Sequence, residues 1–476
     1  MKLPIFPGCV AVAVFLVLSG CSNPAQPDRT AAARSNFTAL TASLENQVAS
    51  FRGKQFKRAI ATAVYTKEEY SAIVAGQGSS RSAADRLMFN KVLQCEGLMR
   101  PNTDYFGSYD SLLSDVVGGF YVDGTDSINV VLQDNVSGPT AEDSITIFHE
   151  LVHALQDQYF NLTALENAVN SSDSYWALRY VVEGEAELLG TYYAYKLEAG
   201  SYPSSPAPIM DAFTFYASSA ESFLDSIHLA GHPLYVQQPL MWAYYSYGPR
   251  FIDSVAGPDW TIIDHTIFAS LPIKTAEVMH PSTYSTNRQE YLLDVTQLAN
   301  YIGTSNILDQ DELGEMLTCV MFREWDFSSY KQIAQGLLAD QIFVYHDPAS
   351  DTLRLGWYTV WQDSLTGANF MANYAALVNR QKGITLPVAA GTVIADSVDR
   401  VYLEQNGASV FVLENYPGSK FSGLVSQMRA IKPYLRSLAK GAEGIVRHPF
   451  LDKSGLAKGV WHDLRRRTPL QVFVPN

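Results

Sequence analysis

The amino-acid sequence predicts an α+β fold that is predominantly helical, with a small mixed sheet and a pair of long helices that carry the functional site. Two segments, from Thr140 to about Tyr159 and from Asp173 to about Lys196, repeat their apolar residues at helical spacing, and a hairpin signal precedes the first. The composition is globular, because 47% of the 476 residues are hydrophobic and 17% are charged. A chain of this length can form one large core or two domains.

The first residues have the pattern of a bacterial lipoprotein signal. An apolar run from Val10 to Leu18 is too short to span a bilayer, and it continues into a block, LSGC, that ends at Cys21 and resembles a lipobox. We therefore expect residues 1–20 to be removed, Cys21 to be acylated, and residues 21–45 to form a flexible tether. By resemblance to Gram-negative lipoproteins, Ser22 favours sorting to the outer membrane, facing the periplasm. The alternative is a plain signal or anchor helix with an incidental cysteine.

Two other cysteines, Cys95 and Cys319, remain in the mature chain. The periplasm permits disulfides, so these thiols either pair and close a long loop or stay buried and free. Neither has the spacing of a zinc ligand.

A strand and a hairpin are expected before the first long helix. Residues Ala59 to Val64 read as a strand, and two strand-like runs between Gly118 and Leu132 flank a turn at Asp123-Gly124. The hairpin therefore lies immediately before the helix that carries the chemistry.

The first long helix contains the sequence HELVH, from His149 to His153. Thr140 is a suitable N-cap, and an acidic residue three positions later completes a near capping box. Spacing of i, i+4 puts both imidazoles on one face, where they can bind one zinc ion with Glu150 beside them as general base. Asp157 lies one turn further along, and we expect it beside the metal histidines. The alternative is an ordinary pair of core histidines.

A catalytic zinc normally takes three protein ligands and keeps one position open. No histidine follows His153 at metzincin spacing, so the third ligand must come from elsewhere. On the second long helix Glu183 and Glu187 share a face. We therefore expect Glu183 to be the third ligand and Glu187 to accept the free N–H of a zinc histidine. The alternative is an i, i+4 ion pair between Arg179 and Glu183 on a solvated face.

These residues resemble the gluzincins, which are HExxH metallopeptidases whose third ligand is a glutamate on a following helix, often within E-x-x-x-D. Glu187 stands where the aspartate is usual, and the gap from His153 to Glu183 is longer than in the archetypal enzymes. A family of bacterial secreted or lipid-anchored proteins of this type is also similar over most of the mature chain, to about Tyr434. The blocks that carry this resemblance are HELVHALQDQYF, ALRYVVEGEAEL, SYGPRF and TAEVMHPSTY, and the shorter matches GGFYVD, LGEM and GLLADQIFVY extend it toward Tyr434.

The resemblance implies a zincin-like catalytic region over residues 46–300, with Zn²⁺ as cofactor and a peptide or protein as substrate. Related enzymes stabilise the charge on the scissile carbonyl with a His or Tyr from the downstream lobe, which His280 or Tyr247 would match here, with His280 preferred. Aromatic packing and a loop histidine are the alternatives for these two. In zincins the strand before the motif helix is commonly the sheet edge that binds an extended peptide. The expected substrate-binding residues are therefore Ile128, Asn129, Val130, Val131 and Leu132.

Residues 301–437 predict a C-terminal α+β region. It ends in a hairpin from Val398 to Leu413, with a turn at Asn406-Gly407, and a helix from Phe421 to about Leu435. A basic tail follows over 438–476, and it either lies on anionic lipid or docks on the acidic body. The net charge of −14 argues against nucleic acid as a partner.

The expected function is that of a lipid-anchored zinc metallopeptidase at the cell envelope, attached to the membrane through Cys21. The alternative is a non-catalytic envelope lipoprotein that uses the same scaffold for binding or assembly.

Overall fold

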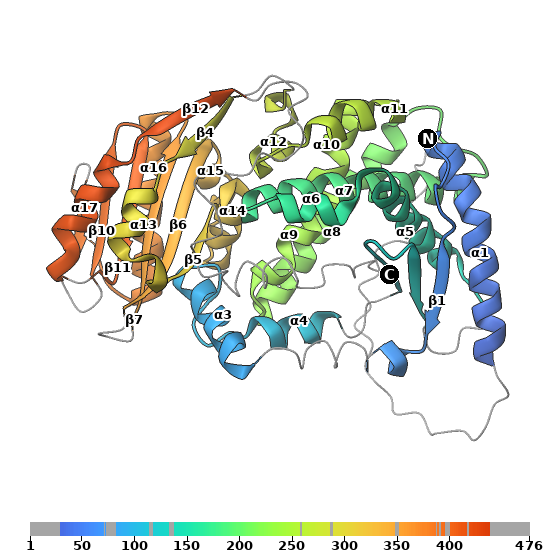
Figure 1. Ribbon diagram of the computed structural model, residues 1–476, viewed down its shortest axis with the longest axis horizontal. Coiled ribbons are helices and arrows are strands. Elements are labelled where there is room, and N and C mark those ends of the chain that lie inside the picture. The colour runs from blue at the N-terminus through green and yellow to red at the C-terminus, as the bar shows by residue number, and fades with distance from the viewer. Residues whose placement is uncertain are drawn as a thin grey trace.

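The computed structural model describes residues 29–437 except for 71, 73–81, 114–117, 133–137, 258, 286–288, 348–351, 387, 390–391, 396–399 and 417 (Figure 1). The fold is α+β, as the sequence predicts. The expected signal segment 1–20, the acylation site Cys21 and the basic tail 438–476 lie outside the described residues. Within the described part of the chain, no helix has the length and hydropathy needed to cross a membrane.

A three-stranded sheet lies close to the N-terminal helix α1 (Arg29–Arg52). Its strand order is β1-β3-β2, with β1 parallel and β2 antiparallel to the central β3. The strands are β1 (Ala61–Tyr65), β2 (Gly119–Val122) and β3 (Ser127–Val131). Gly124 has a φ of +75° in the turn between β2 and β3, so the predicted hairpin is confirmed.

Two expectations about this region are wrong. The segment 21–45 is not a tether throughout, because α1 begins at Arg29 and buries Phe37 and Leu44 at helical spacing in the core. The expected substrate strand, Ile128 to Leu132, is not a sheet edge. Ile128 pairs with Thr62 on one side and Tyr121 on the other, so its backbone groups are already used.

Two long helices pack against each other, α5 (Ala141–Phe160) and α7 (Ser172–Ala199), and α5 also packs against strands β2 and β3 of the small sheet. Gly184 of α7 lies against the backbone of α10. A Cβ at position 184 would lie 2.4 Å from the carbonyl carbon of Gly248, so both glycines are required for this backbone contact. The other helices up to residue 280 are α3 (Ala83–Cys95), α4 (Tyr105–Leu113), α6 (Leu162–Ala168), α8 (Ala207–Leu229), α9 (Gln238–Tyr245), α10 (Tyr247–Ala256), α11 (Trp260–Ile262) and α12 (Thr275–Met279).

A second sheet of seven antiparallel strands dominates the C-terminal part, in the order β5-β6-β7-β11-β10-β9-β8 (Figure 1). Alternate residues of β7 face opposite sides: Trp357 packs in the main core, which includes α14 and α16, and Tyr358 packs in a separate core with α13 and α17. The strands are β5 (Ile307–Asp311), β6 (Leu337–Asp347), β7 (Thr352–Trp361), β8 (Val388–Ala389), β9 (Thr392–Ala395), β10 (Val401–Asn406) and β11 (Ser409–Glu414). The helices are α13 (Thr296–Ile302), α14 (Gly314–Glu324), α15 (Tyr330–Ala334), α16 (Ser364–Lys382) and α17 (Phe421–Ala430).

The C-terminal region begins earlier than residue 301. Strand β4 (Gln289–Leu293) pairs with β12 (Pro433–Ser437), and α13 packs against α17. The predicted boundary at residue 301 falls inside α13. The pairing of β4 with β12 joins segments that are far apart in the chain, and a sequence pattern does not reveal such a pairing. The hairpin β10-β11 with its Asn406-Gly407 turn is confirmed. Cys95 and Cys319 are free thiols and are not paired.

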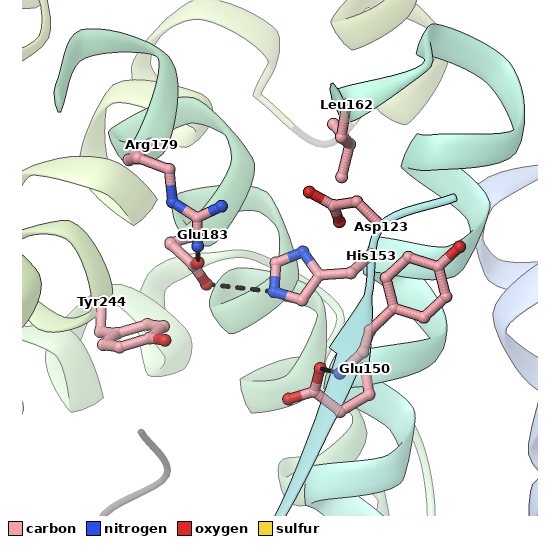
Figure 2. A pocket seen from close by; sticks show the side chains of 8 residues that line it. Asp123, Glu150, His153, Leu162, Arg179, Glu183 and Tyr244 are labelled. Atoms are coloured by element: carbon pink, nitrogen blue, oxygen red, sulfur yellow. Dashed lines mark hydrogen bonds and ion pairs between the residues drawn. The ribbon is translucent and has the colours of Figure 1, made fainter. Parts of the chain in front are cut away.

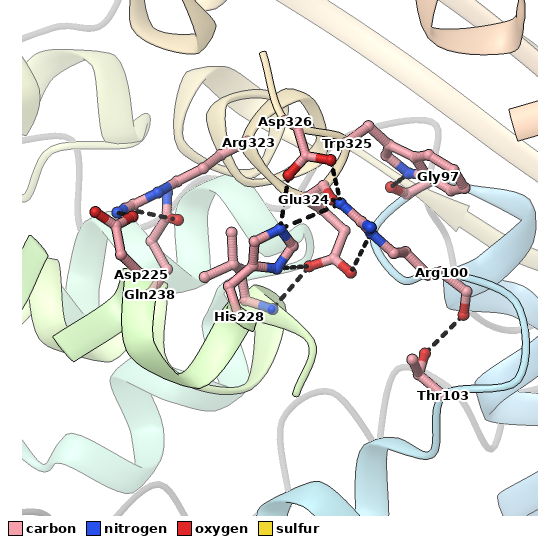
Figure 3. A network of polar contacts seen from close by, with 11 residues as sticks. Gly97, Arg100, Thr103, Asp225, His228, Gln238, Arg323, Glu324, Trp325 and Asp326 are labelled. Atoms are coloured by element: carbon pink, nitrogen blue, oxygen red, sulfur yellow. Dashed lines mark hydrogen bonds and ion pairs between the residues drawn. The ribbon is translucent and has the colours of Figure 1, made fainter. Parts of the chain in front are cut away.

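A polar network around the buried Glu324 joins the ends of α8 and α14 to the segment after α3 (Figure 3). Glu324 accepts the backbone N–H of Leu234 at 2.9 Å, and its carboxylate lies 3.8 Å from Arg100 Nε and 3.7 Å from His228 Nδ1. Asp326 contacts both Arg100 and His228, at 2.7 and 3.1 Å. Burial raises the pKa of Glu324 to about 7, despite the hydrogen bond from Leu234 and the charge of Arg100.

The raised pKa of Glu324 predicts a pH-dependent stability. The pKa of this carboxyl is near 4.5 in the unfolded chain and about 7 in the folded chain. The free energy of unfolding therefore falls as the pH rises from 4.5 to 7, and the full loss of stability applies above pH 7. A Glu324→Gln variant keeps an acceptor for Leu234 but cannot ionise. Its free energy of unfolding is expected to rise relative to wild type by up to about 3 kcal/mol between pH 4.5 and 8. Urea titrations at several pH values measure this difference, and a difference independent of pH would contradict the assignment.

Candidate metal centre

Helix α5 places His149, Glu150 and His153 together in the interior. Thr140 caps the helix: its hydroxyl accepts the N–H of Asp143 at 3.1 Å, and Asp143 in turn accepts the N–H of Thr140 at 2.7 Å. His149 and His153 are 3% and 8% exposed, and their Nε2 atoms lie 3.0 Å apart. The predicted helix start and the shared face of the histidines are confirmed.

Glu183 reaches the same point from helix α7. Its Oε2 lies 3.1 Å from His153 Nε2 and 3.5 Å from His149 Nε2. The three residues are buried, each offers one donor atom, and the donors converge within 4.8 Å of one another. This group could hold a metal ion.

Each histidine has a second partner at its other ring nitrogen. His149 Nδ1 lies 3.3 Å from Glu187 Oε2, the contact that the sequence predicts. His153 Nδ1 lies 2.9 Å from Gln156 Oε1, which the sequence analysis did not anticipate. The Nδ1 atom of each ring therefore has a partner that fixes the ring orientation, as is usual for metal-binding histidines.

Arg179 binds the second oxygen of Glu183. Its guanidinium contacts Glu183 Oε1 and also lies 3.1 Å from Glu166 Oε1. Both side chains are buried. The i, i+4 ion pair between them is therefore present, but it lies beside the two histidines and not on a solvated face. Burial alone would raise the pKa of Glu183, but Arg179 and the histidines hold it well below its ordinary value. Glu183 therefore presents an ionised Oε2 to the two imidazoles.

Glu150 faces the space beside these donors. Its Oε2 accepts the backbone N–H of Tyr121, in strand β2, at 2.7 Å. Burial raises the pKa of Glu150, although the nearby His149 and His153 oppose the shift. A carboxyl group whose pKa is shifted upward toward neutrality suits proton transfer near pH 7.

A small pocket opens next to these groups (Figure 2). Tyr244 of α9 closes one side: its ring lies 5.8 Å from the ring of His149, and its hydroxyl points toward the side where Glu150 and His153 lie. Burial and the carboxylates Glu183 and Glu150 raise the pKa of Tyr244 well above 10, so its hydroxyl keeps its proton. The lining residues are Tyr121, Asp123, Glu150, His153, Leu162, Arg179, Glu183 and Tyr244.

The two expected downstream residues do not line this pocket. Tyr247 packs among aromatic rings, with its centroid 5.2 Å from Trp242 and 6.4 Å from Tyr180. His280 Nε2 pairs at 2.7 Å with Oε1 of Glu315, a residue of α14. Neither residue is therefore placed at this pocket, and Tyr244, three residues before Tyr247, lies beside His149 instead. Adjacent tyrosines on a helix point in different directions, so the cluster alone could not identify the one that faces the pocket.

Asp157 has a different role from the one expected. Its Oδ2 accepts from the Tyr121 hydroxyl at 2.9 Å and from the Gly124 N–H at 2.7 Å, and its Oδ1 accepts from the Leu162 N–H at 2.9 Å. It therefore fixes the β2-β3 turn against the end of α5. Since this turn also carries Asp123, Asp157 shapes the pocket wall.

Sequence reasoning missed several residues of this site. Gln156 follows His153 by three positions, so helical spacing could have identified it. Asp123 was recognised only as a turn residue, yet it lines the pocket, and burial together with Glu166 raises its pKa to about 6. No pattern in the sequence distinguishes Tyr244 from its neighbours.

Comparison with known proteins adds one partial similarity. Residues 304–424 are similar to a family described as a domain of unknown function (DUF8575). This segment spans β5 to the start of α17, so the metal centre lies outside it. No curated protein and no solved structure matches the chain significantly.

Proposed function

We propose that the protein is a zinc-dependent metallopeptidase of the gluzincin type. The observation that carries the proposal is the convergence of His149 Nε2, His153 Nε2 and Glu183 Oε2 beside the buried carboxylate of Glu150. Two imidazoles and one carboxylate with a fourth position open are the donor set of a hydrolytic zinc site.

The separations of the three donors fit zinc. Donors bonded at about 2.0–2.1 Å to a tetrahedral ion stand roughly 3.3–3.4 Å from one another. The observed separations are 3.0, 3.1 and 3.5 Å. Only small movements would therefore bring all three donors to bonding distance. The second partners of the histidines, Glu187 and Gln156, already fix the ring orientations.

The side chains of the site would have different roles in peptide hydrolysis. A zinc ion held there would polarise the scissile carbonyl and acidify a water molecule. Glu150 is placed to take the proton of that water and to deliver it to the leaving amine. Arg179 keeps Glu183 ionised and leaves only its Oε2 free to face the histidines.

Tyr244 is the group proposed to stabilise charge on the carbonyl oxygen. Its protonated hydroxyl points toward the side of the pocket where Glu150 and His153 lie (Figure 2). The β2 strand replaces β3 as the proposed substrate strand, because β2 is one of the two edge strands of its sheet and its Tyr121 lines the pocket.

Comparing two tyrosine variants tests the assignment of Tyr244. Tyr244→Phe is expected to lower kcat by about 10²–10³-fold with little change in zinc affinity, since it removes one hydrogen-bond donor to the transition state. Tyr247→Phe, three residues away in an aromatic cluster, is the matched control and is expected to retain the wild-type rate. Equal effects of the two variants would contradict the role of Tyr244.

A peptide mixture tests the proposed function itself. The zinc-loaded protein is incubated with a diverse library of unstructured peptides, and the products are identified by mass spectrometry. We expect new termini that disappear when a chelator is present and return when zinc is restored. A library left uncut by protein that holds stoichiometric zinc would refute the peptidase and favour a binding or assembly role for the same scaffold.

A further inference from the structure

Gln156 connects His153 to a chain of buried polar side chains. It lies one turn after His153 on α5 and is 2% exposed. Its Oε1 lies 2.9 Å from His153 Nδ1. Its Nε2 donates to two oxygens of helix α7: the carbonyl of Val182 at 3.0 Å and Oε2 of Glu185 at 2.9 Å.

These contacts fix the orientation of the Gln156 amide. A backbone carbonyl and a carboxylate only accept hydrogen bonds, so the amide nitrogen must face Val182 and Glu185 and the amide oxygen must face His153. The reverse orientation would set three oxygens against one another in the interior. His153 Nδ1 therefore donates its N–H to Gln156, which leaves Nε2 as the ring nitrogen available to a metal ion.

The chain continues to the N-terminal helix. Glu185 is 0% exposed, and its Oε1 lies 2.5 Å from Nε of Arg52, near the end of α1. Arg52 is itself held by the carbonyl of Trp260 and by Asp264 Oδ1, each at 2.8 Å. A buried carboxylate needs such a partner, so the position of Glu185 depends on α1.

We propose that Gln156, held in place by Glu185 and Arg52, is a positioning residue that fixes the Nδ1–H tautomer of His153 for metal binding. This inference rests on the proposed metal centre. Because Arg52 belongs to α1, the proposal means that α1 helps to position a metal ligand, although α1 supplies no ligand itself. Loss of an outer partner of this kind typically lowers metal affinity about 10–100-fold.

Gln158 provides a matched control on the same helix. It is 6% exposed, its Oε1 accepts from the N–H groups of Lys57 and Arg58, and its Nε2 donates to Arg58 O and Asp126 Oδ1. Replacing it with methionine therefore removes at least as many side-chain hydrogen bonds as the same change at Gln156, but none to a metal histidine.

The experiment measures the zinc Kd of Gln156→Met and Gln158→Met by competition with a chromogenic chelator, together with the thermal midpoint of each metal-free protein. We expect Gln156→Met to bind zinc about 10–100-fold more weakly than wild type, and Gln158→Met to bind zinc normally even where its thermal midpoint falls. Wild-type zinc affinity in Gln156→Met, or equal losses in both variants, would overturn the proposal.

A second variant, Glu185→Gln, acts one step further along the chain and preserves shape. A neutral amide has one acceptor oxygen, so it cannot satisfy both Arg52 and Gln156. Zinc affinity is expected to fall several-fold, less than in Gln156→Met, and an unchanged affinity would count against the chain. A wild-type protein that binds no zinc would instead refute the proposed function, so the two failures are distinguishable.

Discussion

Replacing Glu183 with glutamine is expected to abolish tight zinc binding. The change removes the ionised donor that α7 supplies, so the affinity should fall by more than the roughly 10–100-fold typical of an outer partner. It also leaves Arg179 buried without its main counter-charge, which typically costs about 3–5 kcal/mol of folding stability. Chelator competition gives the zinc Kd, and urea titration of the metal-free protein gives the stability.

Two further variants separate the loss of a ligand from the loss of stability. Glu166→Gln removes the other carboxylate partner of Arg179, at 3.1 Å, without touching a metal donor, and is expected to keep the wild-type zinc affinity. The double variant Glu183→Gln, Arg179→Met removes the unpaired charge and is expected to recover stability but not zinc binding. Normal zinc affinity in the double variant would exclude Glu183 as a ligand.

Replacing Glu150 with glutamine is expected to stop catalysis while the metal stays bound. Glutamine keeps an oxygen that can accept the Tyr121 N–H, so the local structure should persist. It cannot take a proton, and loss of a general base typically lowers kcat by about 10²–10⁴-fold. Peptide hydrolysis and zinc content are measured on the same preparation.

Glu142→Gln is the control for Glu150→Gln. Glu142 is an exposed residue in the first turn of the same helix, where its charge contributes only the modest helix-dipole term. The rate of this variant should equal that of wild type. A Glu150→Gln variant that cleaves peptides at the wild-type rate would remove Glu150 from the mechanism.

The sequence predicted the parts of the site that depend on helical spacing. The i, i+4 relation of His149 and His153 and the phase of Glu183 and Glu187 follow from the 3.6-residue turn once the two helices are recognised. Thr140 and Asp143 located the first helix because capping is a local interaction. Local rules of this kind can be read from a single chain.

The parts that depend on tertiary contacts were not predictable. Strand β3 was expected at a sheet edge, but β1 joins it in parallel from more than sixty positions earlier in the chain, as the pair Ala61 and Ser127 shows. Tyr244 lines the pocket, whereas Tyr247 packs against Trp242. This difference depends on how α9 and α10 are oriented in the folded chain. Most of the seven-stranded sheet was missed as well, since its long strands β6 and β7 are buried on both faces and lack simple alternation.

The central claim is that one zinc ion is bound by His149, His153 and Glu183. Anomalous scattering from crystals of the wild-type protein, measured on both sides of the zinc absorption edge, tests it most directly. We predict a single strong peak within about 2.0–2.2 Å of His149 Nε2, His153 Nε2 and Glu183 Oε2. The absence of a peak at these three atoms in zinc-saturated crystals, or a peak held by other residues, would contradict the account.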